Sequence, residues 1–311
     1  HPEDARRYFE AAVTKFPDCY QAYNNLGLLS LYAGSPSEAK RNFEKATAIR
    51  PDYPQAIINR ASVDVYQGDY RSAISYLESN LASSKNSVDV MGYTAYVMVL
   101  NGDIEGAIDN ARRALKKDEQ NTNALLAMAW AFYHQDKTEL AEMVFKQISE
   151  IDNTVAEAHY GLGLIALKNK NMSAARDAFM KAVEKRPTFA EAHINLGNFY
   201  LDDQDFVKAE EHLKVAIKYN PSLVKAYIGL GNAYAGMDRE QDALETYQKV
   251  LQMQPGNKEV LFNQGLIYLQ LDPKLKEDAT AQDEMAWNQV VMGRMQTAKT
   301  FLMRYRDELG T

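Results

Sequence analysis

The sequence predicts an all-helical solenoid of antiparallel helix pairs, and two observations lead to this prediction. A pattern of small and apolar residues repeats every 34 positions along most of the chain, and a fixed period of about 20–50 residues is typical of repeat architectures. Hydrophobic residues make up 46% and charged residues 25% of the 311 residues, which provides a core and gives no sign of disorder. The length would suit two or three ordinary domains, but the repeat favours one extended array.

Two columns of small residues carry the repeat. The column expected in the first helix of each unit consists of Gly27, Ala61, Ala95, Ala129, Gly163, Gly197, Gly231 and Gly265. The column expected in the second helix consists of Ala5, Ala39, Ala73, Ala107, Ala141, Ala175, Ala209 and Ala243. Small residues let two helix axes approach closely, and bulky residues of the neighbouring helix fill the space opposite. Helix pairs are therefore predicted without a gap from Ala5 to Gly265.

Helical spacing and turn residues mark the helices within each unit. Ala209, Leu213 and Ala216 lie on one face of an expected second helix at steps of four and three. Glycine suits the left-handed conformation just past a helix end, and it stands in the expected turns at Gly34, Gly68 and Gly102. Proline stops a helix, and the ends of units carry Pro51, Pro187, Pro221 and Pro255.

These features resemble the tetratricopeptide repeat. The 34-residue period, the Leu-Gly pair, the alanines, the aromatic residue and the closing proline are those of that family, and residues 190–197 and 224–231 are close to its consensus. The resemblance implies a right-handed superhelix with a concave groove lined by the first helix of each unit. It divides the chain into the second helix of a truncated repeat (1–19), seven repeats (20–257), and an irregular eighth repeat with an insertion and a C-terminal cap (258–311).

The resemblance also implies a scaffold that binds a peptide segment or a helix of a partner protein in its groove. Exposed aromatic side chains are the usual anchors of an interface, and the groove positions include Tyr96, Trp130, Tyr133 and Tyr160. Asn198 and Asn232 stand one repeat apart, and amide side chains can bond the backbone of an extended peptide. The alternatives are that the rings pack between helices as ordinary core and that the asparagines are solvated.

The second full unit departs from the pattern. Arg60 stands where leucine belongs, Asp64 where an aromatic residue belongs, and Asn80 where alanine belongs. Arg60 and Asp64 are four residues apart on one helix and can pair, and a half-buried charge is costly unless it is paired. These residues therefore form either a satisfied internal ion pair or a polar pocket that accepts a side chain of the partner.

The period also fails after Leu271. A helix with apolar residues at steps of four and three is expected in the following stretch, with Trp287, Val291 and Met295 on its surface and Ala298, Leu302 and Tyr305 further along. Such arrays need a cap over their exposed end, and we expect this helix to supply it. The alternative is a partner-binding or dimerising helix, because the same spacing suits a two-helix seam and a possible homodimer.

Charge and composition argue against several other functions. Lys and Arg number 35 against 42 Asp and Glu, a net charge of -7, whereas nucleic-acid binding needs a clustered cationic face. No stretch approaches the ~20 apolar residues of a membrane span. We predict no catalytic residues, no cofactor and no metal site. His159 and His193 occupy a packing position, and His134 and His212 have no Cys, Asp or His at ligand spacing.

The chain opens inside a repeat, because Ala5, Phe9 and Ala12 form a second helix that lacks its first. The alternative function is therefore a regulatory or substrate-recruiting arm of a larger enzyme, such as a glycosyltransferase. The single cysteine, Cys19, allows no intramolecular disulfide, so any compartment is permitted. The tight repeats fit a bacterial source, with cytoplasm and periplasm both open.

Overall fold

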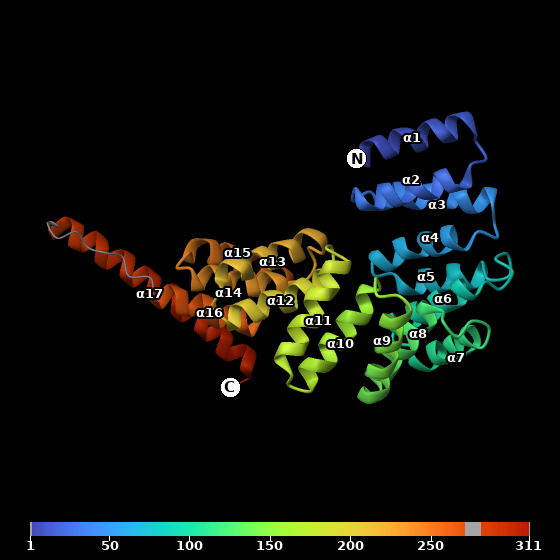
Figure 1. The fold of residues 1–311 in the computed structure, drawn as a ribbon. Coiled ribbons are helices and arrows are strands. Elements are labelled where there is room, and N and C mark those ends of the chain that lie inside the picture. The colour runs from blue at the N-terminus through green and yellow to red at the C-terminus, as the bar shows by residue number, and fades with distance from the viewer. Residues whose placement is uncertain (1, 271–280, 311) are drawn as a thin grey trace. The chain divides into compact units, whose positions relative to one another are not determined.

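The computed structural model of the chain describes residues 2–270 and 281–310, which form α-helices joined by short turns, with no strand among them (Figure 1). The predicted fold class is confirmed, because adjacent helices pack as pairs along the array. The insertion expected after Leu271 lies in 271–280, outside the described residues.

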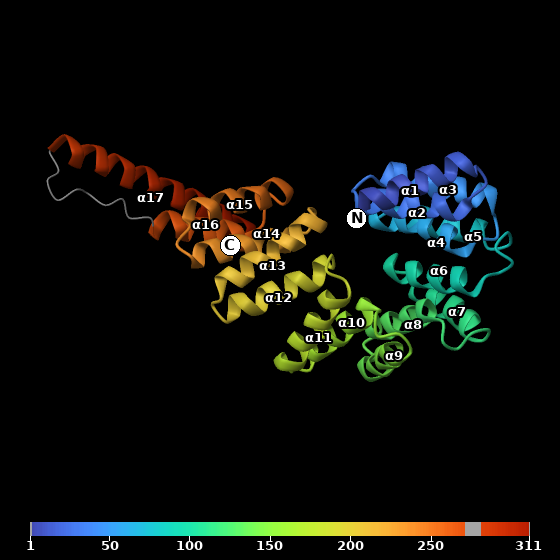
Figure 2. The same ribbon diagram turned by 45° about the horizontal axis from the view of Figure 1, so that its top comes forward.

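The helices form two compact units, His1–Asn169 and Lys170–Thr311. The first contains α1 (Pro2–Lys15), α2 (Tyr20–Tyr32), α3 (Pro36–Ile49), α4 (Pro54–Tyr66), α5 (Tyr70–Ser79), α6 (Val88–Leu100), α7 (Ile104–Leu115), α8 (Thr122–His134), α9 (Thr138–Ile151) and α10 (Ala156–Lys168). The second contains α11 (Met172–Lys185), α12 (Ala190–Asp202), α13 (Phe206–Tyr219), α14 (Val224–Gly236), α15 (Glu240–Met253), α16 (Lys258–Gln270) and α17 (Ala281–Leu309). Figure 2 shows that consecutive helices within each unit stack in chain order.

Small residues in the first helices receive large residues from the second helices. A Cβ atom added at Gly27 would lie 2.5 Å from the Phe43 ring, so only glycine leaves room for that ring. Leu213 of α13 lies against two first helices at once, because added Cβ atoms at Gly197 and Gly229 would stand 2.6 Å and 3.0 Å from its side chain. The alanine column of the second helices is fully buried from Ala39 to Ala243. Leu213 therefore joins its own helix pair to the next one.

The turns within the pairs share one left-handed position. Its φ values are 73°, 78° and 85° at Gly34, Gly68 and Gly102, as the sequence predicts. The same column continues with non-glycine residues at Asp136 (62°), Lys170 (58°), Gln204 (60°) and Asp238 (55°). The stacked helix pairs impose this conformation where the residue itself does not favour it.

Replacing Gln204 by glycine is expected to raise the free energy of unfolding by about 0.5–1 kcal/mol. The left-handed conformation costs a residue with a Cβ about 1–2 kcal/mol, and the greater freedom of glycine in the unfolded chain offsets part of that gain. The reverse change, Gly102→Gln, is expected to lower the free energy by a similar amount, since both residues are exposed. Denaturant titration measures both, and two unchanged midpoints would contradict the prediction.

The helix expected near the C-terminus is present as α17, with 29 residues. Its second half packs against α16, where Ala298 is fully buried, the Tyr268 and Phe301 rings stack at 5.8 Å, and the Phe262 and Tyr305 rings lie 5.3 Å apart. This half covers α16 as the predicted cap.

Candidate protein-binding surface

Aromatic side chains gather on the first helices of three successive pairs, α6, α8 and α10. The Trp130 ring lies 5.6 Å from the Tyr133 ring and 6.2 Å from the Tyr160 ring, measured between centroids. Tyr96 of α6 packs against the same two groups of core residues as Trp130. We call Tyr96, Trp130, Tyr133 and Tyr160 the aromatic cluster.

Each ring of the aromatic cluster is partly buried and partly exposed. The buried side of Trp130 meets the fully buried Phe145 edge-on at 5.0 Å. The structure therefore combines the two alternatives that the sequence left open, core packing and an accessible face. Large aromatic rings held in this way can bury further apolar area against a partner at little cost in conformational entropy.

A buried cap positions α8, which carries two members of the aromatic cluster. The Asn121 side-chain oxygen accepts a hydrogen bond from the Ala124 backbone N–H at 3.0 Å, and its amide nitrogen donates to Asp89 at 2.9 Å. An added Cβ atom at Gly92 of α6 would lie 2.2 Å from the Asn121 oxygen. The cap thus fixes both the start of α8 and its approach to α6.

One edge of the aromatic cluster is charged. The Lys168 ammonium lies 5.9 Å from the Tyr133 ring centroid, binds the Asp136 carboxylate, and donates to the Thr138 hydroxyl at 3.0 Å. The hydrogen bond to Asp136 raises the pKa of Lys168. The cation therefore keeps its charge beside the aromatic surface at neutral pH.

The predicted asparagines differ in their surroundings. Asn198 of α12 is exposed. The Asn232 oxygen accepts hydrogen bonds from the Tyr247 hydroxyl at 2.5 Å and from the Asn263 amide at 3.0 Å, and its nitrogen lies 3.4 Å from Glu259. Asn232 thus bonds Asn263 and not Asn198. We call Asn198, Asn232 and Asn263 the amide row.

Four-residue spacing brings Arg60 and Asp64 together as predicted, in an ion pair with side chains only 11% and 4% exposed. Asp64 also accepts from Lys40 at 3.3 Å, and Arg60 pairs with Glu44 at 3.4 Å. The Arg60 guanidinium lies 4.2 Å from the centroid of the Tyr76 ring. These contacts favour the satisfied ion pair over an open polar pocket.

Asn80 belongs to a different local structure. It follows the end of α5, and its amide donates to the Tyr76 backbone carbonyl at 2.8 Å. None of the hydrogen bonds of Asn80 in the described chain reaches Arg60 or Asp64. Its polar side chain therefore caps a helix end, although it stands in the column that alanine fills elsewhere.

The proposed surface of α17 is partly open. Trp287 and Val291 are half-buried, whereas Met292 and Met295 are 67% and 55% exposed. The possible homodimer through this helix stays a prediction.

Comparison with protein families identifies the repeat. Models described as tetratricopeptide repeats match residues 1–54 and 58–121, 98–165 and 200–261, 178–211, and 156–189. This chain belongs to the tetratricopeptide repeat family. The matched ranges include the helices that carry the aromatic cluster.

The solved structures of Cut9 and IFIT1 share the fold of this tetratricopeptide array. The Cut9–Hcn1 hetero-tetramer of the APC/C matches with a TM-score of 0.59 and 18% identity, over 75% of this chain and 46% of that chain. IFIT1 solved with m7Gppp-AAAA matches with a TM-score of 0.61 and 16% identity, over 97% of this chain and 76% of that chain. MamA has a TM-score of 0.42 and 28% identity, over 51% of this chain and 92% of that chain.

The tetratricopeptide array thus spans about 46% of the Cut9 chain that it matches. At identities of 18% and 16%, Cut9 and IFIT1 show the fold alone. A comparison with curated proteins finds no match.

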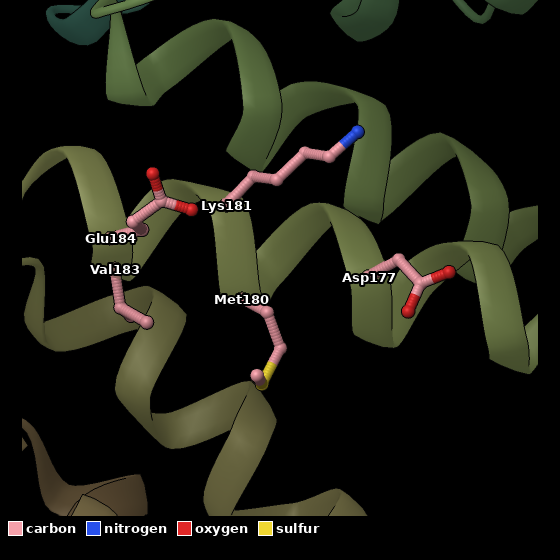
Figure 3. Close-up of a pocket in the computed structure, with 5 residues that line it drawn as sticks. All are labelled: Asp177, Met180, Lys181, Val183 and Glu184. Atoms are coloured by element: carbon pink, nitrogen blue, oxygen red, sulfur yellow. The ribbon is translucent and has the colours of Figure 1, made fainter.

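The array also contains a shallow hollow of about 520 Å³ (Figure 3). Its lining side chains all come from α11 and are Asp177, Met180, Lys181, Val183 and Glu184. Ligand sites usually place convergent polar groups around an enclosed apolar cavity. One exposed helix face does not provide such a cavity, so we do not count this hollow as a site.

Neither a metal site nor a membrane span is found in the described part of the array. Within residues 2–270 and 281–310, no group of three or more His, Cys, Asp or Glu side chains is arranged to hold a metal ion. None of the helices in that part is both long and apolar enough to span a bilayer.

Sequence reasoning missed the contact between two histidines. His193 and His212 lack sequence spacing typical of a site, yet their Nδ1 atoms lie 2.9 Å apart. The sequence indicated only that the two residues lie in the same 34-residue repeat, one in its first helix and one in its second helix.

Proposed function

We propose that this tetratricopeptide array is a protein-interaction scaffold, and that the face formed by α6, α8 and α10 binds a peptide segment or a helix of a partner. The aromatic cluster is the observation that carries the proposal. Its rings come from three successive first helices, and part of each stays exposed. Tyr96, Trp130 and Tyr133 pack against core residues, and Tyr160 lies beside Trp130. A few large aromatic side chains usually supply most of the affinity of an interface.

The surroundings of the cluster suit a mainly apolar partner segment with a polar end. Trp130 and Tyr160 offer apolar ring surface, and Tyr133 links that surface to Lys168 and its partner Asp136. Lysine beside a ring can meet an acidic group or a backbone carbonyl at the edge of the contact. We therefore expect apolar side chains at the centre of the bound segment and polar groups near Lys168.

The amide row in the second unit is a weaker part of the same proposal. Asn198 can donate to and accept from the backbone of an extended segment. The Asn232 oxygen already accepts two hydrogen bonds, so this residue offers chiefly its N–H groups. We expect any peptide contact here to depend more on Asn198 than on Asn232.

The double variant Trp130→Ala, Tyr96→Ala is expected to weaken partner binding at least about tenfold. Each aromatic anchor of an interface typically contributes more than about 1–2 kcal/mol. Pulldown identifies the bound proteins, and titration with the purified partner measures the dissociation constant. The control is Tyr32→Ala, Tyr66→Ala, which removes two rings that are 82% and 62% exposed and lie outside the cluster.

Trp130 also packs on Phe145, so circular dichroism must first show that the variant is folded. Tyr133→Ala provides a second variant that leaves the Trp130–Phe145 contact in place. If both variants bind the same partners as the wild type with unchanged affinity, the aromatic cluster is not the binding surface.

A further inference from the structure

Two imidazoles connect α12 and α13, a helix pair of the compact unit Lys170–Thr311. His193 lies on α12 and His212 on α13, and their Nδ1 atoms are 2.9 Å apart. The two ring centroids are 5.1 Å apart. This distance between ring nitrogens is that of a hydrogen bond. Neither histidine belongs to the aromatic cluster.

The groups around the pair come from four elements. The Pro187 carbonyl, in the turn before α12, lies 3.0 Å from His193 Nε2. The Tyr200 ring of α12 stacks on His212 at 5.3 Å and 25°. The cations Arg176 of α11 and Lys208 of α13 lie over the Tyr200 ring, at 5.9 Å and 5.3 Å from its centroid.

Those two cations have carboxylate partners of their own. Arg176 pairs with Asp203 at 2.6 Å, and Lys208 pairs with Asp205 at 2.7 Å. In the described chain, neither imidazole is bonded to a carboxylate, and no charged group of the packed helix α14 acts on them. A proton added to the pair therefore finds no nearby counter-ion.

The Pro187 carbonyl decides which nitrogens carry hydrogen. A carbonyl only accepts, so His193 Nε2 carries a hydrogen and donates it. In neutral His193 the Nδ1 atom then has a lone pair, and it accepts the hydrogen of His212 Nδ1. Neutral His212 therefore has its free lone pair on Nε2.

Two protons have different effects on this arrangement. The first can bind His212 Nε2 and leave the bond between the Nδ1 atoms intact. The second must bind His193 Nδ1, where it removes the accepting lone pair. Two N–H groups and two positive charges then face each other across the helix pair.

We propose that the His193–His212 pair is an acid-sensitive joint, which holds α12 against α13 until both imidazoles are protonated and then releases them. The released pair would change the first-helix face that carries Asn198, whichever partner the array binds. The proposal is therefore independent of the function proposed above.

The direction of the pH dependence follows from burial. Burial lowers the pKa of both imidazoles, and the repulsion between the two charged rings lowers the pKa of His212 further, to about 4. A free histidine has a pKa of about 6.5, so the opened form binds more protons than the closed form between these values. The closed joint is therefore fully stable above about pH 6.5 and loses stability as the pH falls toward 4.

Hydrogen exchange at pH 7.0 and pH 5.0, corrected for intrinsic exchange rates, tests the joint. A pKa that falls from about 6.5 in the opened form to about 4 in the closed form shifts the equilibrium roughly thirtyfold at pH 5. We expect amides of α12 and α13 to lose at least about tenfold protection relative to those of α14 and α15. Equal loss in both helix pairs would overturn the proposal.

A matched pair of variants separates the joint from general acid sensitivity. His212→Gln keeps an N–H donor toward His193 but does not titrate, and it is expected to reduce the selective loss in α12 and α13. His159→Gln is the control, because His159 Nε2 bonds the Asn153 carbonyl at 3.0 Å, as His193 bonds Pro187, without an imidazole bonded to its Nδ1. A wild-type acid response in His212→Gln would contradict the joint.

If His212→Gln does not fold, titration of the two imidazoles in the wild type still tests the proposal. Nuclear magnetic resonance shifts of the ring protons give the apparent pKa values of the pair. Both are expected below 6.5, and titration of both imidazoles at or above that value would overturn the proposal.

Discussion

Replacing Asp64 by alanine is expected to lower the free energy of unfolding by about 3–5 kcal/mol, the usual cost of removing one partner from a buried ion pair. Asp64 is only 4% exposed and binds both Arg60 and Lys40. Without its carboxylate, the Arg60 guanidinium, 11% exposed, keeps two contacts among the described residues, to the Tyr76 ring and to Glu44, which is 48% exposed. The loss arises because a buried cation then has one half-exposed carboxylate as its counter-ion and no longer has the buried one.

The matched control removes both charges. Arg60→Leu, Asp64→Tyr installs the residue types found at equivalent positions in other units, Leu196 and Tyr200. Replacing both members of a buried pair by apolar residues of suitable size is often neutral or stabilising by about 1–4 kcal/mol. Denaturant unfolding, with hydrogen exchange of α4 and α5, measures both variants. A loss below about 1 kcal/mol in Asp64→Ala would show that this carboxylate is not an essential counter-ion.

Partner affinity of the same double variant bears on the alternative role of this site. An unchanged affinity together with an equal or higher melting temperature would leave Arg60 and Asp64 with a structural role only. A loss of affinity at unchanged stability would restore the polar pocket as a binding feature.

Replacing Phe145 by alanine is expected to cost about 3–5 kcal/mol, which is typical of a fully buried phenylalanine. Its ring is 0% exposed and fills the space above Gly161, where an added Cβ atom would lie 2.3 Å from the ring. The ring also meets Trp130 edge-on. Alanine would leave a cavity between α8, α9 and α10, and the rigid helix pairs can close it only in part.

Met143→Ala is the matched control on the same helix, because Met143 is 63% exposed and its loss is expected to change stability by no more than about 0.5 kcal/mol. Denaturant titration gives the stability difference. Fluorescence of Trp130, in a Trp287→Phe background, reports the loss of the ring contact. Equal stabilities of the two alanine variants would contradict this account of the core.

The aromatic cluster shows how far the candidate site could be predicted. Its residues follow from the groove positions that the family resemblance implies, and the sequence left open whether the rings are core or contact surface. The fraction of each ring that is buried depends on how closely neighbouring helices approach each other. That approach is set by contacts such as Asn121 against Gly92, which no single column of the repeat reveals.

The sequence by itself determined the helix pairs, the buried alanine column and the glycine turns at Gly34, Gly68 and Gly102. These features depend on residue type at a fixed period, and each unit repeats the same contact with its neighbour. Only the tertiary structure decided the left-handed turn at Gln204, the amide row from Asn232 to Asn263, and the bond between His193 and His212. Each of these depends on the distance between groups on packed helices, or on a backbone conformation that packing imposes, and a 34-residue period does not specify either one.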